Sequence, residues 1–363
     1  MRRRTLIGAV AALGTLAAAP SLAGAAGAGR SPVPLLAYYY IWFNPSSWDR
    51  AKRDYPLLGR YSSDEAQIMR THIRWAKAAG INGFLVSWKD TPVLDRRLAR
   101  LVQVADSEHF KLGIVYQGLD FYRRPQKANI VAADLDFFIR RFARDPAFAI
   151  YGKPLVIWAG TWRFSRQKVQ LVTQSRRSRL LILASEKNVG GYARLRGLVD
   201  GDAYYWSSVN PDTYPGYHAK LNQLSGAVHA DRGLWIAPAA PGFDARLIGG
   251  TKTVPRKGGE TLRRELGAAA SSNPDAIGLI SWIEFSEHSF VEPSRRYGRQ
   301  ALATLADVRG ARAPAAPADS SDPAPAKATG ANGIPLDAGF GFVVVLALGF
   351  VARRNRRRLE RVS

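Results

Sequence analysis

Apolar runs that suit buried strands alternate with amphipathic segments along most of the chain, from about residue 33 to residue 309. The runs are short, uniformly apolar and rich in β-branched and aromatic residues, which is typical of strands buried on both faces of a parallel sheet. The segments between them repeat apolar residues every three or four positions, which predicts helices. The eight predicted strands are residues 34–43, 83–88, 112–116, 154–158, 180–184, 203–206, 234–237 and 277–282.

Eight strand–helix pairs in a region of this size predict a protein of the α/β class with one (β/α)8 TIM barrel over residues 31–311. A closing helix is expected over residues 294–308, starting after Pro293. The competing architecture is a doubly wound open sheet. Such a sheet more often has a glycine-rich phosphate-binding turn after its first strand, and residues 40–45 contain no glycine.

The two ends of the chain differ from this pattern. Residues 1–28 begin with arginines and continue as a small, apolar run, which predicts a signal peptide for export. Residues 312–335 are a Pro- and Ala-rich linker, residues 336–352 are a predicted transmembrane helix, and residues 353–363 are a basic tail. We therefore expect a barrel outside the cell, anchored to the membrane by the C-terminal helix, with the tail in the cytoplasm. The alternative is a sorting tail that is cleaved when the domain is attached to the surface.

Composition narrows the chemistry. The chain has no cysteine, which excludes disulfides, thiolate zinc sites and cysteine nucleophiles. Its formal net charge of +23 suits nucleic acid or an anionic cell envelope, but no nucleic-acid-binding motif accompanies the charge and the predicted export argues against that partner. The five histidines lack the spacing of metal ligands, so neither a metal nor a cofactor is expected. The oligomeric state stays open.

Candidate binding residues follow the predicted strands. In a TIM barrel, functional side chains lie at the C-terminal ends of the strands. Aromatic residues interleaved with polar ones suit a glycan there, because rings stack on sugar C–H faces while polar groups bind hydroxyls. A single Trp is more often part of the core, so the signal is that aromatics recur after successive strands. The candidates are Tyr40, Trp42, Trp88, Tyr116, Asp120, Trp206 and Asp244, with Trp162, Glu186 and Lys187 at further strand ends.

Candidate catalytic acids follow the last strand. Glu284 and Glu287 lie three residues apart where the strand breaks into a loop, and Glu292 stands before Pro293. Hydrolysis of a glycosidic bond requires two carboxyl groups, one to protonate the leaving oxygen and one to assist at the sugar. The alternative is that these are surface acids paired with arginines. A barrel with this strand at its rim favours the catalytic interpretation.

Four segments carry a resemblance to a known family. They are Tyr38-Tyr-Tyr-Ile-Trp42, the stretch between Tyr61 and Trp88, Pro241-Gly-Phe-Asp244, and Ile283-Glu-Phe-Ser-Glu-His-Ser-Phe-Val-Glu-Pro293. In this order, with near-matching spacing over about residues 34–308, they resemble glycoside hydrolase family 99, the endo-α-mannosidase and mannanase barrels. They resemble the family 71 α-1,3-glucanases more distantly.

The resemblance implies separate roles for the two acids. Glu284 would remove a proton from the sugar 2-hydroxyl, which then attacks its own anomeric carbon. Glu287 would protonate the leaving oxygen and then activate water, with net retention and no metal. His288 and Glu292 in the same motif are further candidate substrate-binding residues. Ile283, Phe285 and His288 stand where the family has Asn, Trp and Gly. These departures affect the expected substrate and the shape of its binding site more than the acid pair.

Two functions follow from this sequence. The first is a retaining, endo-acting glycoside hydrolase on an α-linked mannan-like or glucan-like polysaccharide at the cell surface. The second is a catalytically inactive barrel that binds envelope polysaccharide through its aromatic residues.

Overall fold

The computed structural model describes residues 33–49, 52–120 and 122–311. The predicted signal peptide (1–28), linker (312–335), transmembrane helix (336–352) and basic tail (353–363) lie outside these residues. Over the three described ranges, no helix has both the length and the apolar character needed to cross a membrane.

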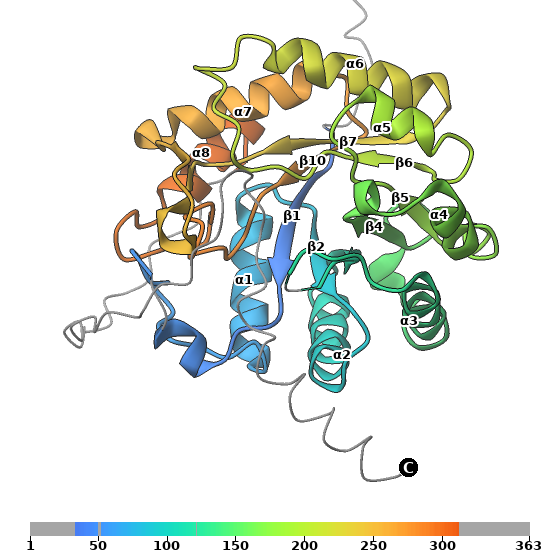
Figure 1. Ribbon diagram of the computed structural model, residues 1–363. Helices are drawn as coiled ribbons and strands as arrows, with labels where there is room; N and C mark the ends of the chain where they lie inside the picture. Colours follow the sequence, from blue (N-terminus) through green and yellow to red (C-terminus); the bar gives the residue numbers. More distant parts are fainter. Residues whose placement is uncertain (1–32, 50–51, 121, 312–363) are drawn as a thin grey trace, which may run out of the picture. The chain divides into compact units, whose positions relative to one another are not determined.

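Eight parallel strands form one sheet surrounded by helices (Figure 1). Their order is β5-β4-β3-β2-β1-β10-β7-β6, and a parallel bridge between Ala184 and Asp202 joins the two ends of that order. The predicted TIM barrel is therefore confirmed. The barrel strands are β1 (Leu35–Tyr40), β2 (Gly83–Trp88), β3 (Lys111–Gln117), β4 (Leu155–Ala159), β5 (Leu181–Leu183), β6 (Gly201–Ala203), β7 (Leu234–Ala239) and β10 (Ala276–Leu279).

Helices α1 to α7 connect successive barrel strands, α8 follows the last one, and together they cover the outside of the sheet. They are α1 (Ala66–Ala78), α2 (Pro92–Ser107), α3 (Ala128–Arg141), α4 (Arg166–Thr173), α5 (Val189–Arg194), α6 (Tyr217–Ala230), α7 (Glu260–Ser271) and α8 (Gln300–Arg309). Single 3-10 turns occur at η1 (Pro45–Asp49), η2 (Pro146–Phe148), η3 (Thr161–Arg163), η4 (Ala245–Ile248) and η5 (Lys257–Gly259).

Some strand ends are shifted, such as those of β6, which covers residues 201–203 and not 203–206. Apart from such shifts, the structure differs from the expected elements in three places. The closing helix begins at Gln300 rather than after Pro293, because residues 294–298 form a separate turn in which Gly298 takes a left-handed φ of +52°. The short helix α5 between β5 and β6 was not expected. Nor was the antiparallel hairpin of β8 (Phe243–Asp244) and β9 (Thr253–Val254), whose two-residue strands are too short for a sequence pattern to show.

Side chains along each strand alternate between the barrel interior and the helix layer. The ring of Tyr38 in β1 stacks on Tyr205 across the barrel at 4.1 Å, and the next residue, Tyr39, faces α1, where its hydroxyl bonds His72 at 3.0 Å. Tyr40 faces inward again, because its hydroxyl lies 2.7 Å from that of Tyr205. Tyrosines along one strand therefore serve both the interior and the helix layer.

Glu292 belongs to a buried polar network between α1 and the segment after β10. One carboxylate oxygen accepts a hydrogen bond from the Tyr61 hydroxyl at 2.7 Å, and the other lies 3.0 Å from His72 Nε2. The side chains of His72 and Glu292 are fully buried. The structure therefore does not support Glu292 as a substrate-binding residue: both of its oxygens are used inside the protein, where they attach the end of the acid-bearing segment to the first helix.

Candidate active site

The two candidate catalytic acids lie in a closed loop that follows β10. The Ser281 amide bonds the Ser289 carbonyl at 2.7 Å, and the Val291 amide returns to the Ser281 carbonyl at 3.0 Å. Within the loop, the Ser281 hydroxyl accepts from the Glu284 amide at 2.9 Å. These bonds hold residues 281–291 as one compact unit at the C-terminal end of a barrel strand, which is the position expected for chemistry in this fold.

Glu284 is a buried acid whose ionised form is disfavoured. Its side chain is almost fully buried, and Oε1 accepts from the Ser286 amide at 3.0 Å. Burial raises the pKa of Glu284 to about 7, against the opposing charge of Lys52 and the amides of Ser286 and Glu287. A carboxyl group with a pKa near neutrality can take and return a proton under ordinary conditions, as a general base must.

Glu287 is buried to the same degree and lies in the same loop. Its carbonyl accepts from the Asp244 amide at 2.7 Å, so the hairpin that contains Asp244 supports the loop from one side. Burial raises the pKa of the Tyr40 and Tyr205 hydroxyls, and the nearby Glu284 and Glu287 raise it further. Two acids and a hydrogen-bonded tyrosine pair therefore meet at this end of the barrel.

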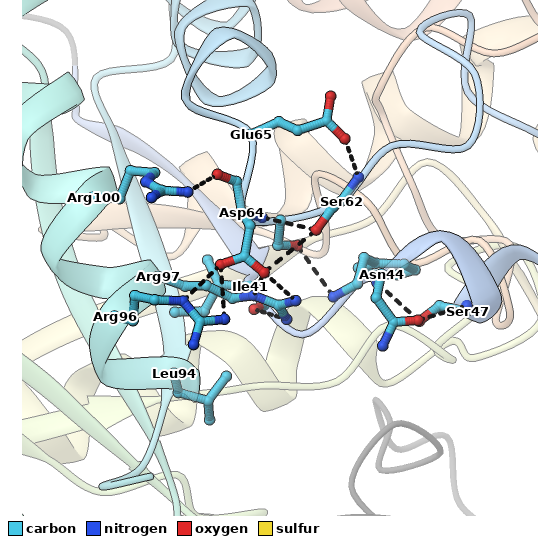
Figure 2. Close-up of polar contacts among 12 residues, drawn as sticks. Ile41, Asn44, Ser47, Ser62, Asp64, Glu65, Leu94, Arg96, Arg97 and Arg100 are labelled. Carbon is cyan, nitrogen blue, oxygen red and sulfur yellow. Dashed lines mark hydrogen bonds and ion pairs between the residues drawn. The ribbon is translucent and has the colours of Figure 1, made fainter. Parts of the chain in front are cut away.

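Trp42 is placed beside this group by the loop after β1. Its ring stacks on Tyr40 with centroids 4.5 Å apart, and it is 8% exposed. Figure 2 shows how the loop is held: Arg97 of α2 binds the Asp64 carboxylate through Nε and Nη2 at 2.9 and 2.8 Å, while its Nη1 donates to the Ile41 carbonyl at 3.0 Å. Burial raises the pKa of Asp64, but hydrogen bonds from Arg97 and Arg96 outweigh it and lower the pKa.

Asp244 lies next to the acids but is already occupied. It forms ion pairs with Arg53 at 2.9 Å and Arg246 at 2.7 Å. The hydrogen bond from Arg246 is the main reason that the pKa of Asp244 falls to about 2, against the effect of burial. Asp244 therefore stays ionised and shares its charge with two arginines, and its backbone supports Glu287.

His288 has an unusual backbone conformation for a side chain of its size. Its φ of +58° lies in the left-handed region, which glycine adopts at little cost, and the family motif that this loop resembles has Gly here. The ring contacts Phe290 and Tyr297, and among the described residues its Nε2 has no hydrogen-bond partner. Burial lowers the pKa of His288 to about 4, so the ring is neutral near pH 7.

Arg256 holds the far side of the loop. It is buried, its Nη2 donates to the carbonyls of His288 at 2.9 Å and Phe290 at 2.7 Å, and its guanidinium lies over the rings of Phe290 and Tyr297. A guanidinium can bind two carbonyls and two rings at once because it is planar and carries several donors. Sequence reasoning missed this residue, since an arginine far along the chain gives no local signal.

Two predicted binding residues lie away from the site. Trp88 and Tyr116 are paired in the β2–β3 register and both face the helix layer. Trp88 Nε1 bonds Asp95 of α2 at 2.9 Å, and the Tyr116 hydroxyl bonds Asp134 of α3 at 2.8 Å; both rings are fully buried. The expectation that they bind substrate is corrected, because the alternation of the strands turns them away from the interior. Asp120 lies in the β3–α3 loop and forms an exposed ion pair with Arg124.

Trp206 lies at the same strand-end rim, in an aromatic cluster formed by residues that follow β4 and β6. Its ring is 5.2 Å from Trp162 and 5.0 Å from Tyr204. Sequence reasoning missed Tyr205, although the Tyr-Tyr-Trp run after β6 was a usable signal. It also missed Lys52, whose Nζ donates to the Ser286 hydroxyl at 2.9 Å.

Comparison with known proteins shows the family of this chain. The sequence model of glycosyl hydrolase family 99 matches residues 42–305, which include the acid loop and most of the barrel. The chain belongs to this family. It is 23% identical over 261 residues to glycoprotein endo-alpha-1,2-mannosidase of Rattus norvegicus and 25% identical over 266 residues to that of Mus musculus. Each match covers 66% of this chain and 56% of the relative, so the chain spans about half the length of these curated relatives.

Solved structures show the same fold. The family 99 endo-alpha-mannosidase from Bacteroides thetaiotaomicron superposes with a TM-score of 0.66 at 18% identity, over 76% of this chain and 96% of that one. A glycoside hydrolase-like protein superposes with a TM-score of 0.56 at 16% identity, over 76% of this chain and 93% of that one.

The role of Arg97 in holding the β1 loop can be tested by comparison with Arg96, which binds the same acid, Asp64. Arg97→Lys removes the fork that joins Asp64 to the Ile41 carbonyl, and we expect the free energy of unfolding to fall by about 2 kcal/mol. Arg96 also binds Asp64 but its side chain is 53% exposed, so Arg96→Lys should cost less than about 0.5 kcal/mol. Urea denaturation measures both variants. Equal losses would show that Arg97 does not hold the loop.

The buried state of Glu284 predicts a pH-dependent stability. Because its pKa rises from 4.5 to about 7 on folding, the folded protein binds the extra proton and the free energy of unfolding falls as pH rises through that interval. The total loss for one such group is about 3 kcal/mol. Glu284→Gln lacks the titrating proton, so the difference in stability between variant and wild type should move in the variant's favour from pH 4.5 to pH 7. Parallel curves for the two proteins would contradict this assignment.

Proposed function

We propose that this chain is an endo-acting glycoside hydrolase that cleaves an α-linked mannan-like polysaccharide with retention. The observation that carries the proposal is the buried Glu284/Glu287 pair in one hydrogen-bonded loop at the end of β10. Family membership supports the hydrolase chemistry, and the rat and mouse relatives are named as endo-alpha-1,2-mannosidases. A glucan-like chain is the alternative substrate.

The two acids divide the work in this proposal. Ionised Glu284 takes the proton of the sugar 2-hydroxyl, and the freed oxygen forms a bond to the anomeric carbon as the glycosidic bond breaks. Protonated Glu287 gives its proton to the leaving oxygen. In the second step Glu287 accepts a proton from water, water opens the three-membered ring, and Glu284 returns the first proton. Two inversions at one carbon give net retention.

Other rim residues would hold the sugar around these acids. Tyr40 and Trp42 stack in parallel beside the acid loop, and the Tyr40 hydroxyl is shared with Tyr205. A stacked aromatic surface next to hydroxyl groups suits a sugar ring, whose faces are apolar and whose edge is polar. His288 stays neutral near pH 7, so it would act as a wall of the site beside Glu287 and not as a proton donor.

Glutamine substitutions test the catalytic assignment. Glu284→Gln and Glu287→Gln each keep the side-chain size but remove the proton chemistry, and we expect each to lower kcat on α-mannan by at least about a thousand-fold. The matched control is Glu260→Gln on α7, whose acid pairs with Arg264 on the surface and should keep full activity. Release of oligosaccharides is the measurement, and the configuration of the new reducing end tests retention. Glycan binding without turnover in the wild type would instead favour a catalytically inactive barrel.

We also propose that the barrel is exported and held at the cell membrane. Support comes from the sequence of residues 1–28, which resembles a signal peptide, and of residues 336–363, an apolar run followed by arginines. Deleting residues 336–363 should move the protein from the membrane fraction to the medium or periplasmic fraction. The full chain serves as the control. An unchanged distribution between the fractions would exclude this segment as the anchor.

A further inference from the structure

A second group of cationic and aromatic side chains lies along the rim from the acids, where β4, β5 and β6 end. Trp162 follows β4 in η3, Lys187 follows β5, and Trp206 follows β6. These strands are neighbours around the barrel (Figure 1). The Lys187 ammonium lies 5.0 Å from the centre of the Trp162 ring and 5.5 Å from that of Trp206. Three consecutive strand ends therefore bring one cation and two indole rings together.

A second lysine joins the same group from the helix that follows β6. Lys220 on α6 bonds the Tyr204 hydroxyl at 2.9 Å, and its Nζ lies 4.7 Å from the centre of that ring. The Tyr204 ring in turn contacts Trp206 at 5.0 Å. The two lysines and three rings form one contiguous group of side chains, in which Tyr204 and Trp206 are buried and the other three are half-buried. We call it the lysine–aromatic cluster (Trp162, Lys187, Tyr204, Trp206 and Lys220).

The cluster carries an excess of positive charge. Burial lowers the pKa of Lys187, and the neighbouring Arg163 and Arg123 lower it further; burial, Lys187 and Lys252 do the same to Lys220. Glu186 opposes this effect on the pKa of Lys187, and its carboxylate also binds Arg194 at 3.1 Å. Like charges held this close disfavour one another, so an anion placed among them would be bound favourably.

The cluster adjoins the proposed cleavage site through Tyr205. This residue lies between Tyr204 and Trp206 in the chain, and its hydroxyl bonds that of Tyr40 beside the two acids. The lysine–aromatic cluster and the acid pair are therefore linked through one hydrogen-bonded tyrosine pair, and both lie at the strand-end rim of the barrel. Aromatic rings suit the sugar faces of a glycan, and ammonium groups suit a carboxylate or phosphate attached to them.

We propose that the lysine–aromatic cluster is a subsite for a negatively charged substituent, a carboxylate or a phosphate, on the glycan that this chain binds. This inference rests on the proposed function, because it assigns the substrate class of the same site. It makes the natural substrate an anionic α-linked polysaccharide and not a neutral mannan. It also gives a role to part of the high positive charge of the chain.

Calorimetric binding to three oligosaccharides tests the subsite. The probes are a neutral α-mannotetraose, the same tetrasaccharide with one 6-phosphate, and a tetrasaccharide that contains glucuronic acid. The protein is the full chain with Glu287→Gln, so that the probes are not consumed. We expect at least one anionic probe to bind about ten-fold more tightly than the neutral one at low salt, with the preference shrinking at high ionic strength. Which of the two is preferred distinguishes phosphate from carboxylate.

Substitutions then locate the preference. Lys187→Gln with Lys220→Gln should remove the ten-fold difference, while Lys187→Arg with Lys220→Arg should retain most of it. Lys153→Gln is the matched control, because Lys153 is an exposed lysine just before β4, at the opposite end of the barrel. The Tm of each variant checks folding. Equal binding of all three probes, or a preference that survives the double Gln substitution, would overturn the proposal.

The two proposals fail in different ways. Cleavage of neutral mannan without any preference for the anionic probes would leave the hydrolase intact and reject the subsite. Lysine-dependent binding of an anionic probe without cleavage of any glycan by the wild-type chain would support the subsite and reject the hydrolase.

Discussion

Burying a carboxyl group penalises its charged form, and at the rim of this barrel the penalty falls on Glu284, whose side chain is 1% exposed. Burial keeps the pKa of the acid high only if its side chain cannot reach solvent or form an ion pair with a nearby cation. The loop from Ser281 to Val291 prevents escape by bonding its own two ends together. Lys52 acts on Glu284 but leaves its pKa near neutrality. Much of the surrounding structure serves to keep this loop in place.

Arginine provides much of that support by binding backbone carbonyls. Arg256 binds the carbonyls of His288 and Phe290 in the acid loop, and Arg97 binds that of Ile41 in the β1 loop. Elsewhere Arg176 binds Ala132 and Arg309 binds Val33 in the same way. A carbonyl oxygen accepts hydrogen bonds from a guanidinium but carries no net negative charge. Arginines that bind carbonyls in this way therefore leave the net positive charge of the protein high. The basic composition is thus partly structural, and it does not require a nucleic-acid partner.

The barrel and the acid pair could be predicted from sequence because both depend on local pattern. Apolar runs at regular spacing identify the strands, and Glu284 and Glu287 are close in the chain. It was harder to predict which side chains of each strand face the barrel interior. Trp88 ends β2 as Tyr40 ends β1, but the register pairs Tyr40 with Ser87, which leaves Trp88, and Tyr116 beside it in β3, on the helix side. In a uniformly apolar strand, the sequence does not show which residues face the barrel interior and which face the helices. Contacts between distant segments, such as Arg256 with the acid loop or Glu292 with His72, have no signature in a single sequence.

The seam of the barrel lies between its two shortest strands. β5 and β6 have three residues each, and the bridge from Ala184 to Asp202 joins them. So short a ladder gives amide protons little protection, and hydrogen exchange should be fastest there among the barrel strands. Lys187 and Trp206 follow the two strands that meet at this seam. A glycan that contacts both residues would stabilise the pairing of β5 with β6. Its binding would therefore slow the exchange of amide protons in these two strands.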